Sequence, residues 1–97
     1  MAHTWISTAD GDLLRADQIR QITIVEGLRA VTTTGSQFLI AEINGRAATL
    51  TAARALAAAI AEADTRSHAT EIDVERDELA WTVRLTTMPD PALPAPK

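Results

Sequence analysis

An alanine-rich stretch, Thr49–Ala63, constrains the fold of this chain more than any other feature, because it is the one unmistakable helix in the sequence. Ten alanines lie between Ala47 and Ala63, and alanine favours the helix because it loses no side-chain rotamer freedom. At 3.6 residues per turn, one arc of this helix is apolar and the opposite arc is polar. The apolar arc holds Leu50, Ala53, Leu56, Ala57 and Ile60, and the polar arc holds Thr51, Arg54, Glu62 and Thr65. The pattern predicts a helix that covers one face of a sheet, with Thr49 as its N-cap.

Short segments of β-favouring residues precede this helix and are separated by turn residues. We expect strands over His3–Thr8, Leu13–Arg15, Arg20–Val25, Leu28–Thr33 and Gln37–Ile43. An Asp-Gly step and a Thr-Gly-Ser step are typical hairpin turns, because glycine adopts a positive φ without penalty. Ala16–Ile19 is expected to form a tight helical turn, and Asn44-Gly45 to end the sheet before the helix.

Two further segments follow the helix. Glu71–Glu78 is predicted to be a strand that enters a charged turn, with a short helix over Asp73–Leu79 as the alternative. Leu79–Thr87 alternates apolar and polar residues and is predicted to be a strand with Trp81 in the core. The last ten residues contain four prolines, and proline cannot donate a hydrogen bond in a sheet interior.

These elements predict an α+β fold, with an antiparallel β-sheet in the order ββββ-α-ββ and one principal Ala-rich helix packed on one face. We expect residues 1–87 to form a single domain and residues 88–97 to form a flexible, proline-rich tail. A chain of 97 residues can bury one modest core.

Residues 5–63 show a recognisable plan: an Asp-Gly hairpin, the turn ADQIRQI, the hairpin VTTTGSQFLIAE and a closing helix. This plan resembles the small bacterial FlbD-like flagellar family. The resemblance implies an architecture and no active site.

Composition excludes several classes of protein. The net charge of −4 argues against direct nucleic acid binding, which depends on Lys and Arg. The sequence contains no cysteine, so disulfides and thiolate sites are excluded. No apolar run approaches the ~20 residues that span a bilayer, and nothing resembles a signal peptide. We therefore expect a cytoplasmic protein that does not bind membranes.

Catalytic chemistry finds little support in the sequence. His3 and His68 lie in polar or terminal settings, and Ser7, Ser36 and Ser67 have no flanking motif of a nucleophile. We expect no catalytic residue, no cofactor and no metal site, and hence no enzyme.

One charge pattern remains as a candidate partner-binding site. Glu71, Asp73, Glu75 and Asp77 would line one face of a strand at period two. Four neighbouring carboxylates repel one another, so they need solvent, a cation, or arginines on a neighbouring strand or another chain. Carboxylates spaced ~7 Å apart do not converge on one metal ion as the ligands of a calcium loop do.

Three functional hypotheses follow. The first is a non-catalytic interaction or assembly module that forms a homodimer through a sheet edge or the helix face, because the segment between Ile19 and Ile43 has few residues that would obstruct an edge. The second is an acidic regulator or decoy that binds a basic, nucleic-acid-associated protein through Glu71–Glu78. The third, with the least support, is a small enzyme or ligand-binding protein.

Overall fold

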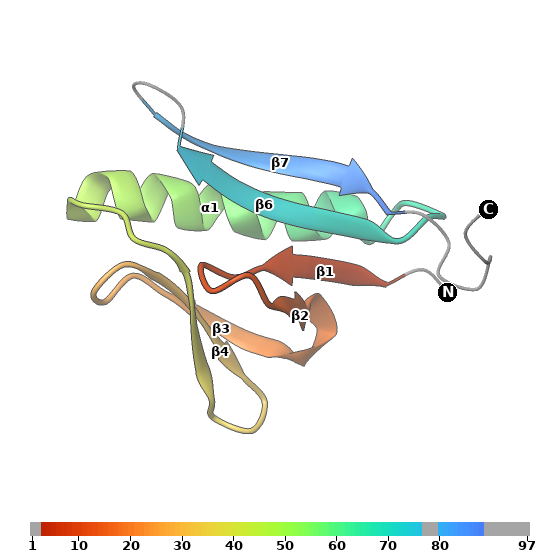
Figure 1. Ribbon diagram of the computed structural model, residues 1–97, viewed down its shortest axis with the longest axis horizontal. Helices are drawn as coiled ribbons and strands as arrows, with labels where there is room; N and C mark the ends of the chain where they lie inside the picture. The colour runs from red at the N-terminus through yellow and green to blue at the C-terminus, as the bar shows by residue number, and fades with distance from the viewer. Residues whose placement is uncertain (1–2, 77–79, 89–97) are drawn as a thin grey trace.

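The computed structural model describes residues 3–76 and 80–88. One long helix packs against strands that form two sheets (Figure 1). In chain order the elements are β1 (Thr4–Ser7), β2 (Leu13–Arg15), the 3-10 turn η1 (Ala16–Gln18), β3 (Ile19–Thr23), β4 (Leu28–Thr32), β5 (Gln37–Ala41), α1 (Arg46–Ala63), β6 (Thr70–Arg76) and β7 (Trp81–Thr87). The predicted α+β class and its single principal helix are confirmed.

The larger sheet has four strands in the order β2-β1-β6-β7. β1 pairs with β2 in the predicted Asp-Gly hairpin, and β6 pairs with β7 in a second antiparallel hairpin. The two hairpins join through β1 and β6, which run parallel with Ile6 opposite Ile72. The predicted antiparallel sheet is therefore corrected in two respects: the strands form two sheets, and β1 pairs with β6 in parallel.

The smaller sheet is the antiparallel meander β3-β4-β5. The connection between β3 and β4 has positive φ at Glu26 (55°) and Gly27 (103°), a conformation that glycine adopts without penalty. One backbone hydrogen bond ties this sheet to the turn of the first hairpin: Ala9 N–H donates to the Leu39 carbonyl at 2.8 Å. Another ties it to η1: Thr33 N–H donates to the Gln18 carbonyl, also at 2.8 Å. Five strands precede the helix, one for each of the five segments expected there and one more than the predicted order ββββ-α-ββ contains.

Helix α1 begins three residues before the predicted start. Gly45, with φ of 92°, is the N-cap residue, and no side chain caps this end. The prediction of Thr49 as N-cap was wrong, because Thr49 is buried inside the helix. Its hydroxyl donates to the carbonyls of Gly45 (2.7 Å) and Ile43 (3.2 Å), and so fixes the chain between β5 and α1.

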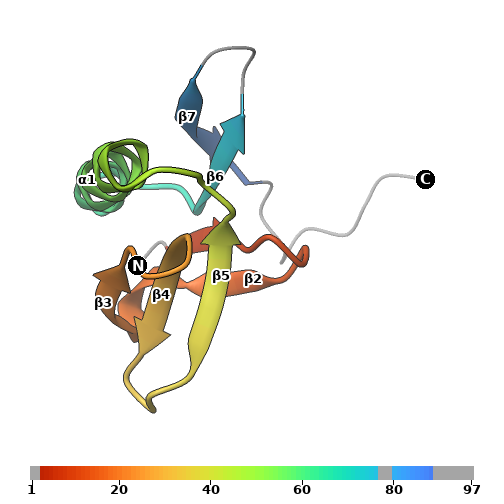
Figure 2. The same cartoon turned by 90° about the vertical axis from the view of Figure 1, so that its left-hand side faces the viewer.

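The buried stripe of α1 is also rotated from the predicted arc. It consists of Thr49, Ala52, Leu56, Ala59 and Ala63. Leu56 is fully buried as expected, whereas Ile60 is half-buried and Ala57 is exposed. Small residues occupy the centre of the contact because the helix lies against both the β6–β7 hairpin and the smaller sheet (Figure 2), and small side chains permit close approach. The bulkier Leu50 and Ile60 flank this stripe.

The core lies between the helix and the two sheets. Its fully buried aliphatic side chains are Ile6, Leu28, Leu56 and Ile72. Trp81, predicted to be in the core, packs against it but stays half-buried. At 25 cal/mol per Å² of apolar surface, each buried Leu or Ile stabilises the fold by roughly 2 kcal/mol.

The segment after the helix settles one alternative. Thr70–Arg76 is a strand, so a helix beginning at Asp73 is excluded over these residues, and residues 77–79 lie outside the described part of the chain.

Met88 N–H donates to the Ala69 carbonyl at 2.8 Å, so Met88 belongs to the fold and not to the tail. The rest of the predicted tail, residues 89–97, lies outside the described residues. Among the helices of the described residues, none has the length and apolar character to cross a bilayer.

Leu56→Ala tests the helix packing. Because Leu56 is fully buried between helix and sheets, the substitution should lower the free energy of unfolding by about 2–5 kcal/mol, measured by chemical denaturation. Arg54→Ala on the exposed arc is the matched control and should change it by less than about 0.5 kcal/mol. Equal effects of the two substitutions would contradict the assignment of the buried face.

Candidate functional site

The outer edge of β7 is the most prominent surface feature of the fold. Among the described strands, β7 pairs with β6 alone and lies at the end of its sheet. Trp81, Val83 and Leu85 face the helix side and are half-buried, while the alternate residues, Thr82, Arg84 and Thr86, are exposed. Over residues 3–76 and 80–88, β7 is thus a seven-residue strand with one row of backbone N–H and C=O groups that no other strand pairs. Such a row is a template for pairing with another strand.

An apolar groove runs beside this edge, between β7 and α1. It has a volume of about 580 Å³ and is lined by Ala55, Ala58, Ala59, Glu62, Trp81, Thr82, Val83 and Leu85. Figure 1 shows β7 at the outer edge of the sheet, whereas α1 lies behind β6. The helix side of β7 is therefore only partly covered, because the residues of α1 that face it are alanines.

β7 also lacks the features that obstruct strand edges. Its pairing with β6 has no bulge along the whole register from Thr70↔Thr87 to Arg76↔Trp81, and Arg84 is its one charged residue. The smaller sheet, where the sequence placed the open edge, is interrupted by register shifts in both of its strand pairs. Bulges twist an edge away from flat pairing. The structure thus has a regular edge without a bulge at β7, whereas both strand pairs within residues 19–41 contain register shifts.

The predicted acidic residues lie on the other face of the same hairpin. Glu71, Asp73 and Glu75 alternate along β6 with the buried Ile72, so they share the face away from the core. Asp77, the fourth predicted member, lies outside the described residues. Arg84 sits opposite Asp73 and its Nη2 lies 3.1 Å from Oε2 of Glu75. The acidic face therefore contains its own counter-charge, an arginine on the neighbouring strand β7.

Glu71 is the carboxylate of this face that the protein environment perturbs. Burial raises the pKa of Glu71 above its ordinary value, and the charge of Asp73 and a hydrogen bond to Asp73 raise the pKa further. In the register, Glu71 lies between Trp5 of β1 and Thr86 of β7. Neither neighbour carries a charge that would stabilise the carboxylate, so the pKa shift marks the end of the face that Arg84 does not neutralise.

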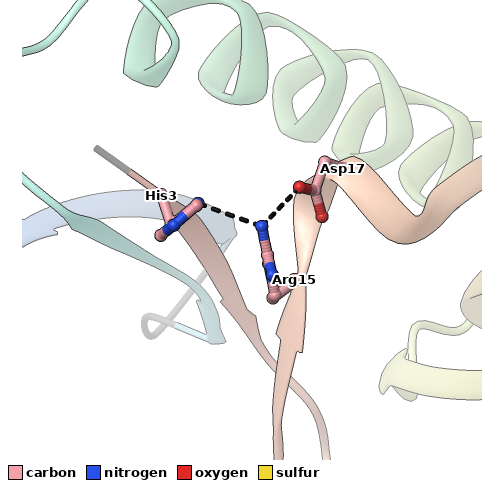
Figure 3. A network of polar contacts seen from close by, with 3 residues as sticks. All are labelled: His3, Arg15 and Asp17. Atoms are coloured by element: carbon pink, nitrogen blue, oxygen red, sulfur yellow. Dashed lines mark hydrogen bonds and ion pairs between the residues drawn. The ribbon is translucent and has the colours of Figure 1, made fainter. Parts of the chain in front are cut away.

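His3 takes part in a small polar network at the start of β1. Nη2 of Arg15 lies 3.0 Å from Nδ1 of His3 and 2.6 Å from Oδ2 of Asp17. Figure 3 shows the guanidinium between the two partners. Because a guanidinium can only donate, Nδ1 of His3 accepts, and the network joins β1, β2 and η1. The side chains are exposed, so its contribution to stability is small.

A hollow of about 440 Å³ lies at the beginning of α1, with Glu26, Glu42 and Arg46 among its lining residues. The helix N-terminus favours anions, whereas the two glutamates disfavour them, so the charges of this hollow oppose one another. Over residues 3–76 and 80–88, no three His, Asp or Glu side chains form a cluster that could hold a metal ion. His68 is exposed in the loop before β6.

Comparisons with protein-family models, with curated proteins and with solved structures gave no match. The resemblance to FlbD-like proteins therefore stays a prediction. The class of protein that the structure defines is a small α+β domain with an open edge strand beside an apolar groove.

The pKa of Glu71 gives a direct test of the acidic face. The carboxyl of Glu71, followed by NMR, should titrate above the ordinary value of 4.5. Asp73→Asn should move the midpoint down without abolishing the shift, because burial is the larger cause and remains. A midpoint at or below the ordinary value in the wild type would contradict this description.

The same shift predicts a sign for the dependence of stability on pH. A carboxyl whose pKa is higher in the folded than in the unfolded state binds its proton more tightly when folded. The ionised carboxylate of Glu71 therefore lowers the free energy of unfolding at neutral pH. This loss is removed as the pH falls through the folded-state pKa and the carboxyl takes up its proton. The free energy of unfolding of the wild type relative to Glu71→Gln should rise on acidification, by no more than about 1 kcal/mol for this solvent-screened group.

Proposed function

We propose that this protein is a non-catalytic interaction or assembly module that acts in the cytoplasm and forms a homodimer at micromolar concentration. The observation that carries the proposal is the open, regular edge of β7 beside an apolar groove. Natural proteins either obstruct such an edge or pair it, and β7 has little that obstructs it.

The composition of this surface also supports association. Trp81, Val83 and Leu85 remain half-buried in the single chain, so a partner that covers them removes further apolar surface from water. Aromatic residues are enriched at the centres of interfaces, and charged residues are depleted there. Trp81 fits this pattern, and Arg84 is already engaged with Glu75 of its own chain.

The proposal contains no catalytic step. Of the candidate catalytic residues, His3 uses Nδ1 to accept from Arg15, and Ser7, Ser36 and Ser67 have no hydrogen bond from their side chains to a histidine among the described residues. These contacts suit a structural role, and binding through a surface needs no nucleophile.

A second candidate function rests on the acidic face. Glu71 and Asp73 lie two residues apart on one face of β6. Burial is the largest cause of the raised pKa of Glu71, and repulsion by Asp73 raises it further. A basic protein that covers Glu71, Asp73, Glu75 and the predicted Asp77 would relieve this repulsion. On this alternative the module is an acidic regulator or decoy, and its complex is held by charge.

Sedimentation equilibrium over about a hundredfold range of concentration tests the homodimer. The mass should approach twice 10.4 kDa at micromolar concentration. It should change little between about 0.05 and 0.5 M salt, because an interface of strand pairing and apolar contact is nearly indifferent to screening. A single species of 10.4 kDa at every concentration would end the proposal.

Two lysine substitutions then locate the contact. Thr82→Lys places a charge on the β7 edge and should favour the monomer, since an edge lysine obstructs pairing. Leu13→Lys places the same charge on β2, the opposite edge of the same sheet, and should leave the dimer intact. Both positions are exposed, so neither substitution should disturb the fold, which circular dichroism can verify.

A further inference from the structure

We propose that two copies pair β7 with β7 in an antiparallel manner, across a twofold axis that passes through Val83. The two four-stranded sheets then become one continuous sheet with β7 at its centre. This inference rests on the proposed homodimer and adds the interface, the symmetry and the register.

The symmetry limits the possible registers. In a twofold contact the same strand pairs with itself, and residues directly opposite each other in an antiparallel pair point to the same face. Registers centred on a residue therefore keep both α1 helices on one face of the joined sheet. β7 runs from Trp81 to Thr87, and the centres to compare are Thr82, Val83, Arg84 and Leu85. The Leu85 centre sets Val83 opposite the partner's Thr87 and leaves Trp81 without a partner residue within the described strand.

The Val83 centre matches the apolar side chains of the groove. Val83 lies opposite the partner's Val83, and Trp81 lies opposite the partner's Leu85. Within each chain, Val83 already pairs with Val74, and Leu85 with Ile72. The joined sheet would then have continuous apolar rows on its helix face, which cross-strand pairs of aromatic and aliphatic residues stabilise.

The Val83 centre also brings opposite charges close together on the face of the sheet away from the helices. Arg84 lies opposite the partner's Thr82, and Thr82 in its own chain pairs with Glu75. Each arginine therefore lies between Asp73 of its own chain and, two strands away, the partner's Glu75. Neighbouring strands are about 4.8 Å apart, so these long side chains can meet across the twofold axis.

The Arg84 centre has one advantage and one cost. It would pair all seven residues of β7, from Trp81 to Thr87, but it sets Arg84 directly opposite the partner's Arg84. Like charges in directly opposed positions destabilise a sheet. The Thr82 centre shortens the paired segment and places Trp81 opposite the partner's Val83, leaving Leu85 without an apolar partner within the described strand.

The chain's own C-terminal segment is the competing occupant of the β7 edge. Residues 89–97, PDPALPAPK, follow directly after the hairpin and contain prolines at positions 89, 91, 94 and 96. Proline has no N–H to donate to a ladder. A second β7 offers a donor and an acceptor at every residue, so the observations favour a second copy.

Cysteine cross-linking tests the register, because the chain has no cysteine of its own. Val83→Cys should form a disulfide between two copies in a glutathione redox buffer. Thr82→Cys and Arg84→Cys, each alone, should cross-link poorly, whereas an equal mixture of the two should give several-fold more disulfide than either alone. Cα atoms of opposed pairs lie alternately about 5.5 Å and about 4.5 Å apart, and a disulfide can span both distances.

The outcomes separate this inference from the proposed function. Efficient cross-linking of Arg84→Cys alone, or of Thr82→Cys alone, would overturn the Val83 register. A wild type that sediments as a dimer while no variant cross-links would overturn the β7 interface and leave the homodimer standing. A wild type that remains at 10.4 kDa would overturn both. Each variant is first checked by sedimentation under reducing conditions, so that a folding defect is not mistaken for a missing contact.

Discussion

The parallel pairing of β1 with β6 is the contact on which the rest of the structure depends. It places Ile6 opposite Ile72, both fully buried, and is extended by a backbone hydrogen bond from Thr70 N–H to the His3 carbonyl at 3.1 Å. Parallel neighbours require a crossover connection, and here the crossover contains the whole smaller sheet and α1. The β6–β7 hairpin is thereby brought beside the first hairpin, with α1 lying against it.

Local features of the fold could be predicted from the sequence. The Asp-Gly hairpin, the turn at Ala16–Gln18, the meander and the alanine-rich helix all follow from turn chemistry, alternation and propensity, which act over a few residues. The parallel pairing could not be predicted in this way, because nothing in Thr4–Ser7 or Thr70–Arg76 specifies the other as its neighbour. The helix face was misassigned for a related reason: the predicted arc followed the bulky Leu50 and Ile60, whereas contact with two sheets selects the small residues.

The candidate site also has features that local spacing predicts and features that depend on strand order. The alternation of carboxylates along Glu71–Glu75 was visible in the sequence, because period-two spacing alone determines it. The accessible edge was not, because its position depends on strand order. The alternation in Leu79–Thr87 predicts a strand but not its place in the sheet, and in the structure β7 is the edge. Arg84 likewise becomes the counter-charge of Glu75 only through the β6–β7 register.

A strand at the end of a sheet, half-covered by a helix of small residues, leaves both its backbone and its apolar face available to a partner. Hydrogen exchange measured as a function of protein concentration tests this most directly, because it reports protection of individual amides. The account predicts that amides of Trp81–Thr87 that exchange rapidly in dilute solution become protected as the concentration rises, while those of β2 and β3 do not change. Protection that is independent of concentration along β7, or that increases in the smaller sheet instead, would contradict it.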